Sequence, residues 1–335
     1  MPQKIKYCNT YYECEGDSKK MPYPYDIDSI NRQATENPVK FAGECEAVFN
    51  RKVEEAAAAI TERALATGDH VVFLSGPSGS GKTTTAKRIC SALEGIGVHA
   101  HTVSMDQYYL SPKREDAPRT ESGEIDLESP LCLDLELLNN HFHSLNKGEE
   151  VLVPHFSFKL QDRDPEKAMP LRLRDEDIVI YEGIHALNDM LTEEHPNAFK
   201  LYISARSDVV RDGEVIFKRT WTRILRRAVR DSLFRGTGAL ETLKMWATVR
   251  RGEKEYISPY KYKADLLFDS SMAYEIPIMK QFAIKAIYKV PDEIERYEEL
   301  SEILRMLYEI KDINPECVPH YSVLREFIGG GSYKY

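Results

Sequence analysis

The residues best suited to chemistry form a glycine-rich stretch, GPSGSGKT, at 76–83. It fits the pattern Gly-x-x-x-x-Gly-Lys-[Ser/Thr] and stands between an apolar run, VVFLS, and a helical pattern, as a phosphate-binding loop requires. In such a loop glycines let N–H groups point at phosphates, the lysine reaches the β and γ oxygens, and the hydroxyl binds Mg²⁺. The stretch predicts a site for ATP or GTP with Mg²⁺, lined by Gly76, Ser78, Gly79, Ser80, Gly81, Lys82, Thr83 and Thr84.

This loop alone fits a kinase, a GTPase, a motor or a nucleotide-gated binding module. A GTPase is expected to carry an Asn-Lys-x-Asp guanine reader. The most similar string, NKGE at 146–149, lacks the final aspartate. The GTPase interpretation is therefore disfavoured.

Two acidic residues follow predicted strands. Asp106 comes after the strand at 99–104, and Glu182 after the strand at 177–181. Ligands of an open α/β sheet bind at the carboxyl ends of its strands, and a kinase needs a carboxylate for the proton of the attacking hydroxyl. We predict Asp106 as this base and place Asp106, Glu182 and Thr83 around Mg²⁺. The alternative is a capping role for Asp106 and a solvated loop position for Glu182.

A basic stretch, RILRRAVRDSLFRG at 223–236, carries arginines at helical spacings. They could close over phosphates and neutralise the charge of phosphoryl transfer. The alternative is an amphipathic helix with a solvated basic face and an apolar stripe of Ile224, Leu225, Val229 and Leu233. The arginines are Arg223, Arg226, Arg227, Arg230 and Arg235, and we expect Arg230 to be an exposed lid residue.

Short apolar runs alternate with helical patterns, which predicts an α/β fold with a doubly wound parallel sheet. The predicted strands are 71–75, 99–104, 177–181, 200–204 and 264–268, and a hairpin insertion is predicted from 151–154 and 170–174.

Four regions are expected along the chain. They are an N-terminal arm at 1–40, a leading helix at 41–68 that stops at Gly68, a nucleotide-binding domain at 69–271, and a C-terminal helical extension with a tail at 272–335. Within the extension a helix is predicted at 292–310, and the glycines at 329–331 predict a loose tail.

Bulk properties exclude several classes. A net charge of −9 disfavours a nucleic-acid scaffold, and the lack of a long apolar run or apolar leader predicts a cytoplasmic protein without a membrane span. The six cysteines show no Cys-x-x-Cys spacing, which disfavours a disulfide framework or zinc site. The expected partners are ATP and a small-molecule acceptor, and a homo-oligomer is compatible with the sequence.

Taken in order, GPSGSGKT, MDQYY, YEGI and RRAVRDSLFRG resemble the uridine kinase and phosphoribulokinase family over about 71–271. The uridine/cytidine kinases are the most similar members. The strings at 245–260 and 264–270 look like a bacterial uridine kinase-like branch. Kinases of that branch often follow a domain related to threonyl-tRNA synthetase, for which the N-terminal arm is too short.

The resemblance implies roles for individual residues. It makes Asp106 the base, Lys82 and Thr83 the phosphate and Mg²⁺ groups, and Glu182 a metal-side acid. On the acceptor side it implies a tyrosine contact and a carboxylate for ribose hydroxyls, and on the phosphate side it implies arginines. These positions are Tyr109, Glu128, Arg227, Arg230 and the lid residue Arg235.

The base pocket departs from the family. Phe156 and Phe158 keep two aromatic positions, but the nucleoside kinases have a tyrosine where Phe156 stands and a histidine where Gln161 stands. Thr237 replaces a second lid arginine. The implied acceptor is the 5′-hydroxyl of uridine or cytidine. Another polyol or sugar phosphate, such as a ribulose phosphate or inositol-like acceptor, and a non-catalytic nucleotide-binding module are the alternatives.

Overall fold

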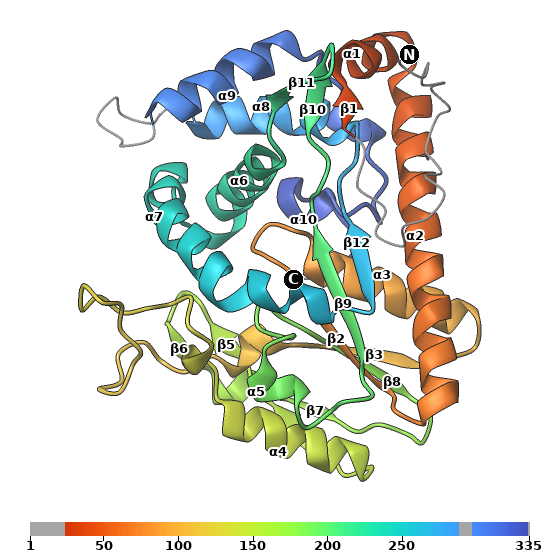
Figure 1. Ribbon diagram of the computed structural model, residues 1–335, viewed down its shortest axis with the longest axis vertical. Helices are drawn as coiled ribbons and strands as arrows, with labels where there is room; N and C mark the ends of the chain where they lie inside the picture. Colours follow the sequence, from red (N-terminus) through yellow and green to blue (C-terminus); the bar gives the residue numbers. More distant parts are fainter. Residues whose placement is uncertain (1–23, 288–296, 334–335) are drawn as a thin grey trace, which may run out of the picture.

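A five-stranded parallel sheet forms the centre of the protein (Figure 1). The structure is a computed structural model, and it describes residues 24–287 and 297–333. All predicted strands are present, with bounds within two residues of those expected. From edge to edge they are β12 (Leu266–Asp269), β9 (Phe199–Ser204), β2 (Val71–Ser75), β8 (Ile178–Glu182) and β3 (Ala100–Ser104).

Helices cover both faces of this sheet, as predicted for a doubly wound fold. Successive side chains of a strand point to opposite faces. In β2, Val72 and Leu74 therefore pack in the core that includes α2 (Pro38–Thr67) and α3 (Lys82–Gly95). Val71 and Phe73 pack in a second core with α4 (Leu135–Asn146).

The order of the strands brings the phosphate loop to the middle of the sheet. Strand β2 lies between β9 and β8, and the chain runs from β2 through α3 to the far edge strand β3. Chain connections leave the two sides of β2 in opposite directions, which opens a crevice at the carboxyl ends. The loop that follows β2, Asp106 after β3 and Glu182 at the end of β8 meet there.

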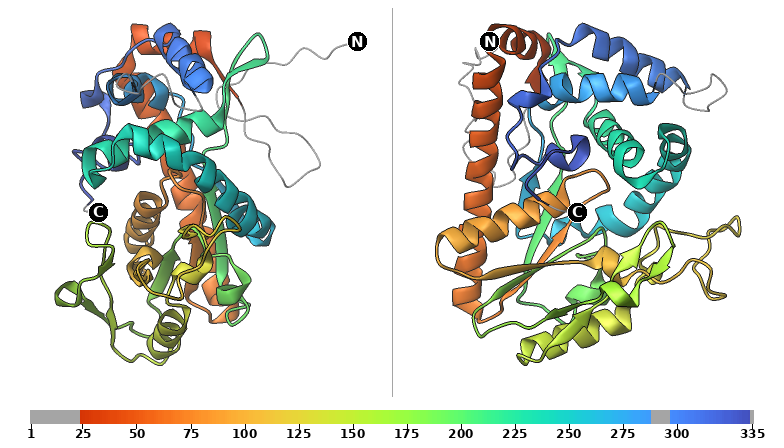
Figure 2. Two further views of the ribbon diagram at one scale, coloured as in Figure 1. Left: turned by 90° about the vertical axis from the view of Figure 1, so that its left-hand side faces the viewer. Right: turned by 180° about the vertical axis from the view of Figure 1, so that it is seen from behind.

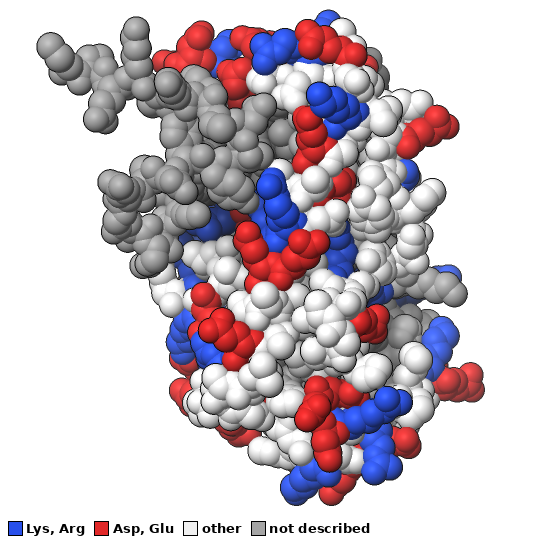
Figure 3. Space-filling model, turned by 90° about the vertical axis from the view of Figure 1, so that its right-hand side faces the viewer, with Lys and Arg blue, Asp and Glu red and all other residues white. Residues whose placement is uncertain are grey.

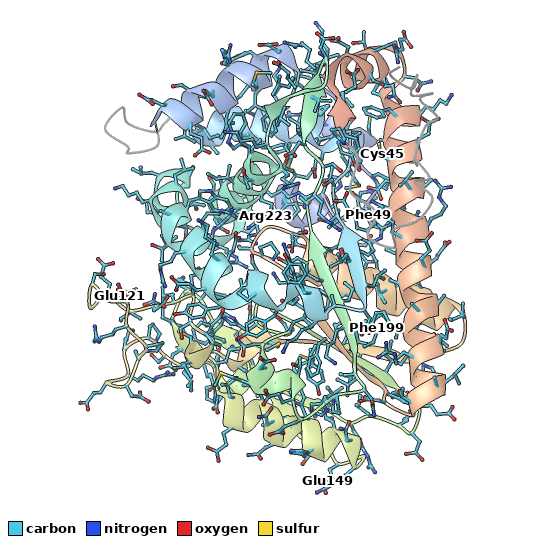
Figure 4. The ribbon with its side chains drawn as sticks, viewed as in Figure 1. Cys45, Phe49, Glu121, Glu149, Phe199 and Arg223 are labelled. Carbon is cyan, nitrogen blue, oxygen red and sulfur yellow. The ribbon has the colours of Figure 1, made fainter. Side chains whose placement is uncertain are left out.

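The leading helix is confirmed and begins earlier than predicted. It starts at Pro38 and ends at Gly68, whose φ of 71° gives the left-handed C-terminal cap. Phe49 points from α2 toward the sheet, and its ring centroid lies 5.2 Å from that of Phe268 (Figure 4). This packing fixes α2 along the sheet.

The described part of the N-terminal arm contains regular structure. Residues 24–36 form strand β1 (Tyr25–Asp26) and helix α1 (Ile27–Glu36), for which the sequence showed no clear apolar period. The carboxylate of Asp26 caps the helix by accepting from the amide of Ser29 at 2.8 Å. Ile27 and Ile30 are buried at helical spacing. Residues 1–23 lie outside the described residues.

Two hairpins extend the sheet domain. The predicted one is confirmed as β4 (Val151–Val153) paired with β7 (Met169–Leu171). Within it, β5 (Phe156–Ser157) pairs with β6 (Asp162–Arg163). The other hairpin, at 209–217, was not predicted; β10 (Val209–Arg211) pairs with β11 (Glu214–Phe217) and with β1.

Helices follow the hairpin at 209–217 and the last central strand, β12. The helices α6 (Arg219–Arg230) and α7 (Ala239–Gly252) precede β12. The extension contains α8 (Glu275–Ile287), α9 (Tyr297–Glu309) and α10 (Arg325–Ile328). The start of the helix predicted at 292–310 lies outside the described residues. Short α5 (Asp189–Thr192) precedes β9.

The C-terminal tail is packed, so the prediction of a loose tail is wrong. The amide of Ser332 donates to the carbonyl of His320 at 2.9 Å. Phe327 and Val323 are fully buried. The guanidinium of Arg325 donates to the carbonyl of Val318 at 2.6 Å, which fixes the turns around α10. Glycine composition alone did not reveal these contacts.

Charges are mixed on the face shown in Figure 3, where Lys and Arg alternate with Asp and Glu. No helix within 24–287 and 297–333 is long and apolar enough to cross a membrane. The described cysteines, Cys45, Cys90, Cys132 and Cys317, are free thiols. Cys8 and Cys14 lie outside the described residues.

Candidate active site

The loop between β2 and α3 needs its glycines for backbone geometry. Gly79 and Gly81 have φ values of 76° and 84°, which side chains other than glycine rarely adopt. At Gly76 a Cβ atom would collide with the carbonyl oxygen of Ile203. The sequence therefore folds here into the tight turn that points N–H groups into the loop.

Two arginines of α6 donate hydrogen bonds to the backbone of this loop. Arg223 donates through Nε and Nη2 to the carbonyl of Ser78 at 3.0 and 2.9 Å. Arg226 is completely buried and donates to the carbonyls of Gly79 and Ser80 at 3.3 and 3.4 Å. Figure 4 shows Arg223 beside the loop. These two side chains are braces of the loop.

Buried carboxylates balance these two arginines. Arg223 is paired with Glu253 of the segment after α7, and Arg226 with Glu275 of α8. The prediction that all five arginines close over phosphates is therefore wrong for Arg223 and Arg226. Ile224, Leu225 and Val229 of the alternative apolar stripe are buried, but Leu233 lies beyond the end of α6 and is exposed. Arg223, Arg226 and Arg230 are buried, so the basic face is not solvated. Sequence reasoning missed both carboxylates, because their partners lie 30 and 49 residues away.

The remaining arginines converge on one carboxylate. Asp231 accepts from Arg230 at 2.7 Å and forms ion pairs with Arg227 at 3.4 Å and Arg235 at 3.8 Å. Arg227 also donates to the hydroxyl of Ser78 at 2.9 Å. Arg230 is only 9% exposed, so the prediction that it is an exposed lid residue is wrong.

Lys82, Thr83, Glu182 and Asp106 meet at the carboxyl ends of β2, β8 and β3. The Thr83 hydroxyl donates to Glu182 at 3.0 Å. Ser104, the last residue of β3, is the register partner of Glu182, and Asp106 follows two residues later in a 3₁₀ turn. The chain after Glu182 passes so near this turn that a side chain at Gly183 would collide with Met105.

The charged groups at these strand ends act on one another's pKa. Burial and the nearby Asp106 carboxylate raise the pKa of Glu182 to about 7, against the opposing effect of Lys82. Burial lowers the pKa of Lys82, while Glu182 and Asp106 act to raise it. The site thus concentrates two carboxylates and one ammonium group beside the phosphate loop.

This oxygen-rich corner fits Mg²⁺. Mg²⁺ prefers carboxylate, hydroxyl and phosphate oxygens, and is usually held by one or two protein carboxylates together with substrate phosphates. Asp106, Glu182 and the Thr83 hydroxyl supply such oxygens. A divalent cation would relieve the repulsion that raises the pKa of Glu182. No group of three or more His, Cys, Asp or Glu side chains among the described residues encloses a metal by itself.

An aromatic cluster lies beside this corner. The ring centroid of Tyr109 is 5.7 Å from that of Phe156 and 6.3 Å from that of Phe158. The Arg235 guanidinium lies 5.0 Å from the Phe158 ring centroid. Phe156 is held in place because its amide donates to the side-chain oxygen of Gln107 at 2.9 Å. Three predicted acceptor residues are therefore neighbours.

Gln161, another predicted acceptor residue, lies in the hairpin that carries Phe156 and Phe158. It occupies the turn of the β5–β6 hairpin with a φ of 55°, and it is exposed. Its carbonyl accepts from the Ser111 hydroxyl at 3.1 Å.

Glu128 is held in the same region by contacts that sequence reasoning missed. Burial raises the pKa of its carboxyl to about 7, although Arg227 acts to lower it. Asp126 accepts from the Glu128 amide at 3.2 Å and is bound by Arg251 at 2.6 Å and Tyr256 at 3.0 Å. These partners lie 125 and 130 residues away from Asp126, so no local pattern could reveal them.

His185 is another group that sequence reasoning missed, although it follows Glu182 by three positions. It is 1% exposed. Burial, reinforced by the charge of Lys82, lowers the pKa of its ring to about 4. The imidazole is therefore neutral at pH 7.

A parallel sheet whose central strand leads into a phosphate loop, with carboxylates at two neighbouring strand ends, defines a P-loop kinase. Residues 71–277, more than half of the chain, match the Phosphoribulokinase / Uridine kinase family. The chain belongs to that family, which confirms the resemblance drawn from the motifs. Membership implies the use of ATP to phosphorylate a hydroxyl of a small molecule.

Individual relatives are similar over the same region. The chain is 27% identical over 209 residues to a uridine kinase of Staphylococcus aureus (strain JH9), which covers 62% of this chain and 91% of the relative. A solved structure of a putative fructose transport system kinase from Silicibacter sp. TM1040 is 20% identical, with a TM-score of 0.48, covering 64% of this chain and 98% of that one. A possible uridine kinase from Bacillus stearothermophilus is 19% identical, with a TM-score of 0.42, covering 65% and 98%.

Proposed function

We propose that the protein transfers the γ-phosphoryl group of ATP to the 5′-hydroxyl of a ribonucleoside such as uridine or cytidine. The observation that carries this proposal is the meeting of Asp106, Glu182, Lys82 and Thr83 beside an aromatic cluster and a buried carboxylate. The first group has the chemistry for phosphoryl transfer, and the second has the chemistry for a base and a ribose.

Asp106 takes the proton of the acceptor hydroxyl as the hydroxyl oxygen bonds to the γ-phosphorus. The bond between that phosphorus and the β,γ-bridging oxygen breaks, and ADP leaves. Lys82 and Arg227 place positive charge against the phosphate oxygens, where charge develops during the transfer. Thr83 and Glu182, with Asp106 nearby, would hold Mg²⁺, which would supply positive charge against the phosphate oxygens when bound.

The acceptor side favours an aromatic ring with a diol. Tyr109, Phe156 and Phe158 offer surfaces on which a planar base can stack, and such stacking tolerates different bases. Glu128 can accept hydrogen bonds from a pair of ribose hydroxyls. With Gln161 exposed in its turn, we expect shallow discrimination between uridine and cytidine.

The test is ADP release from MgATP in the presence of a panel of nucleosides, 2′-deoxynucleosides, sugar phosphates and polyols. We expect turnover with ribonucleosides, and higher KM values for the deoxy forms because Glu128 loses a charge-assisted partner. Glu128→Ala should raise the ribonucleoside KM and remove the difference between the two sugar types. Turnover of a polyol or sugar phosphate, with none for any nucleoside, would overturn the acceptor assignment alone.

Lys82→Ala is the control for the loop. It should abolish turnover and weaken ATP binding while the fold persists, because the lysine contacts the β and γ oxygens. Lys147→Ala, at the exposed C-terminal cap of α4, removes the same charge away from the loop and should retain turnover. Full activity of Lys82→Ala would contradict the phosphate-loop assignment.

A further inference from the structure

The C-terminal segment, residues 318–332, lies directly on the phosphate loop. Both views in Figure 2 place this dark blue part of the chain beside the orange loop between β2 and α3. The Glu326 carboxylate accepts from the Thr84 hydroxyl at 2.6 Å and from the Thr84 amide at 3.3 Å. Val323 packs so close to Gly81 that a Cβ atom on that glycine would clash with it. The segment therefore touches both ends of the turn into α3.

This contact belongs to a well-packed region. Val323, Leu324 and Phe327 are fully buried. The guanidinium of Arg226, which braces the loop from the other side, lies 5.2 Å from the Phe327 ring centroid. Ser322 lies 3.2 Å from the hydroxyl of Tyr274, which donates to Glu46 of α2 at 2.7 Å. The position of Glu326 is thus set by the core.

The hydrogen-bond donors that Glu326 binds are of the kind that bind the phosphates of a nucleotide. Thr84 follows the lysine and hydroxyl of the loop motif, in the first turn of the 14-residue helix α3. N–H groups at such a helix start, together with the loop amides, cradle the phosphates of a bound nucleotide. A carboxylate is an anion with similar acceptor oxygens. Two anions cannot share the Thr84 amide without strong repulsion.

We propose that the Glu326 carboxylate occupies a phosphate position of the ATP site, so that the C-terminal segment competes with the phosphates of ATP. Glu326 must then release Thr84 when nucleotide binds. This inference rests on the proposed function, because it takes the loop as the ATP site. The segment also contacts the arginine-bearing region, since Phe234 lies against Gly329. We therefore expect release of Glu326 to change the packing around Asp231.

The experiment is titration calorimetry with MgATP on the full chain and on single variants. Removing the charge in Glu326→Gln should lower the Kd for MgATP roughly tenfold, the scale of a hydrogen bond to a charged group. Glu326→Ala should lower it at least as much. Glu316→Gln is the matched control, because this exposed glutamate of the same region lies away from the loop, in a 3₁₀ turn that Asn314 caps, and its loss should leave Kd unchanged. Unfolding midpoints check that the variants fold.

A second readout follows the segment itself. Amide hydrogen exchange at 318–329 in the wild-type protein should speed up when MgATP binds, because the contact with Thr84 opens.

The outcomes separate the two proposals. If the wild type binds MgATP, Lys82→Ala does not, and both Glu326 variants bind as the wild type does, the loop assignment stands and the competition is refuted. Slower exchange at 318–329 on binding would also refute it. Absence of MgATP binding by the wild type and by every Glu326 variant would refute the proposed function, and the competition with it. Binding gained only when Glu326 is replaced would support both.

Discussion

Replacing Glu275 by alanine should destabilise the protein strongly, although the residue lies outside the motifs. Glu275 is the carboxylate partner of Arg226, and both side chains are almost completely buried. Without Glu275, Arg226 keeps neutral partners, the carbonyls of Ser270 at 2.9 Å and of Gly79 and Ser80. Carbonyl dipoles cannot neutralise a buried charge as a carboxylate does.

The magnitude follows from this burial. Breaking a buried ion pair from one side costs about 3–5 kcal/mol, because the remaining charge stays desolvated. The exposed pair Lys40–Glu44, at 3.8 Å on α2, provides the contrast. Glu44→Ala should change the free energy of unfolding by no more than about 0.5 kcal/mol.

The assay is urea denaturation with the slope of the transition checked for constancy, so that the midpoint shift reports stability. The double variant Arg226→Met with Glu275→Leu should recover most of the loss, because an apolar pair of similar size removes the uncompensated charge. A loss for Glu275→Ala of less than about 1 kcal/mol, close to that of Glu44→Ala, would refute the reasoning that this pair is a desolvated brace of the loop.

Three further predictions concern the site. Asp106→Asn should slow turnover by about 10² or more while MgATP still binds, and Asp116→Asn, in an exposed loop, should not; equal rates in a steady-state assay would make Asp106 structural. The folded pKa of Glu128, about 7, exceeds its value of about 4.3 in the unfolded chain, so this group stabilises the fold below pH 4 and that contribution is lost as pH rises through 7. Glu128→Gln should therefore be more stable than the wild type at pH 8 by roughly 3 kcal/mol, with little difference at pH 4, in denaturation curves at both pH values. Arg230→Ala should lower the melting temperature as well as turnover, whereas Arg235→Ala, 39% exposed, should lower turnover alone; scanning calorimetry that finds equal melting temperatures would contradict the burial argument.

The sheet could be predicted from the sequence because its strands are short, apolar and rich in β-branched residues. β2, for example, has the sequence VVFLS and is buried along its whole length. The loop after β2 could also be predicted from the sequence, because positive φ values at Gly79 and Gly81 favour glycine at those positions. Local conformation and local composition agree in these segments.

The sequence did not predict the ion pairs of the site that join residues distant in the chain. Helical spacing grouped Arg226 with Arg227 and Arg230, but it could not say which would meet a buried carboxylate. That outcome depends on Glu275 and Asp231, which tertiary packing brings to the helix. The packed tail was missed for the same reason, because Phe327 packs against Arg226 of α6, about a hundred residues earlier in the chain.

The contact between Thr84 and Glu326 spans 242 residues of the chain, and that between Glu46 and Tyr274 spans 228. A nascent chain that has just completed the sheet therefore still has an uncovered turn at the start of α3. Closing such long loops costs entropy before the contacts stabilise them, so assembly around this turn belongs late in folding. The motif of the nucleotide loop spans eight consecutive residues. The loop is nevertheless fully packed only after the residues near 326 have been synthesised and have packed against it.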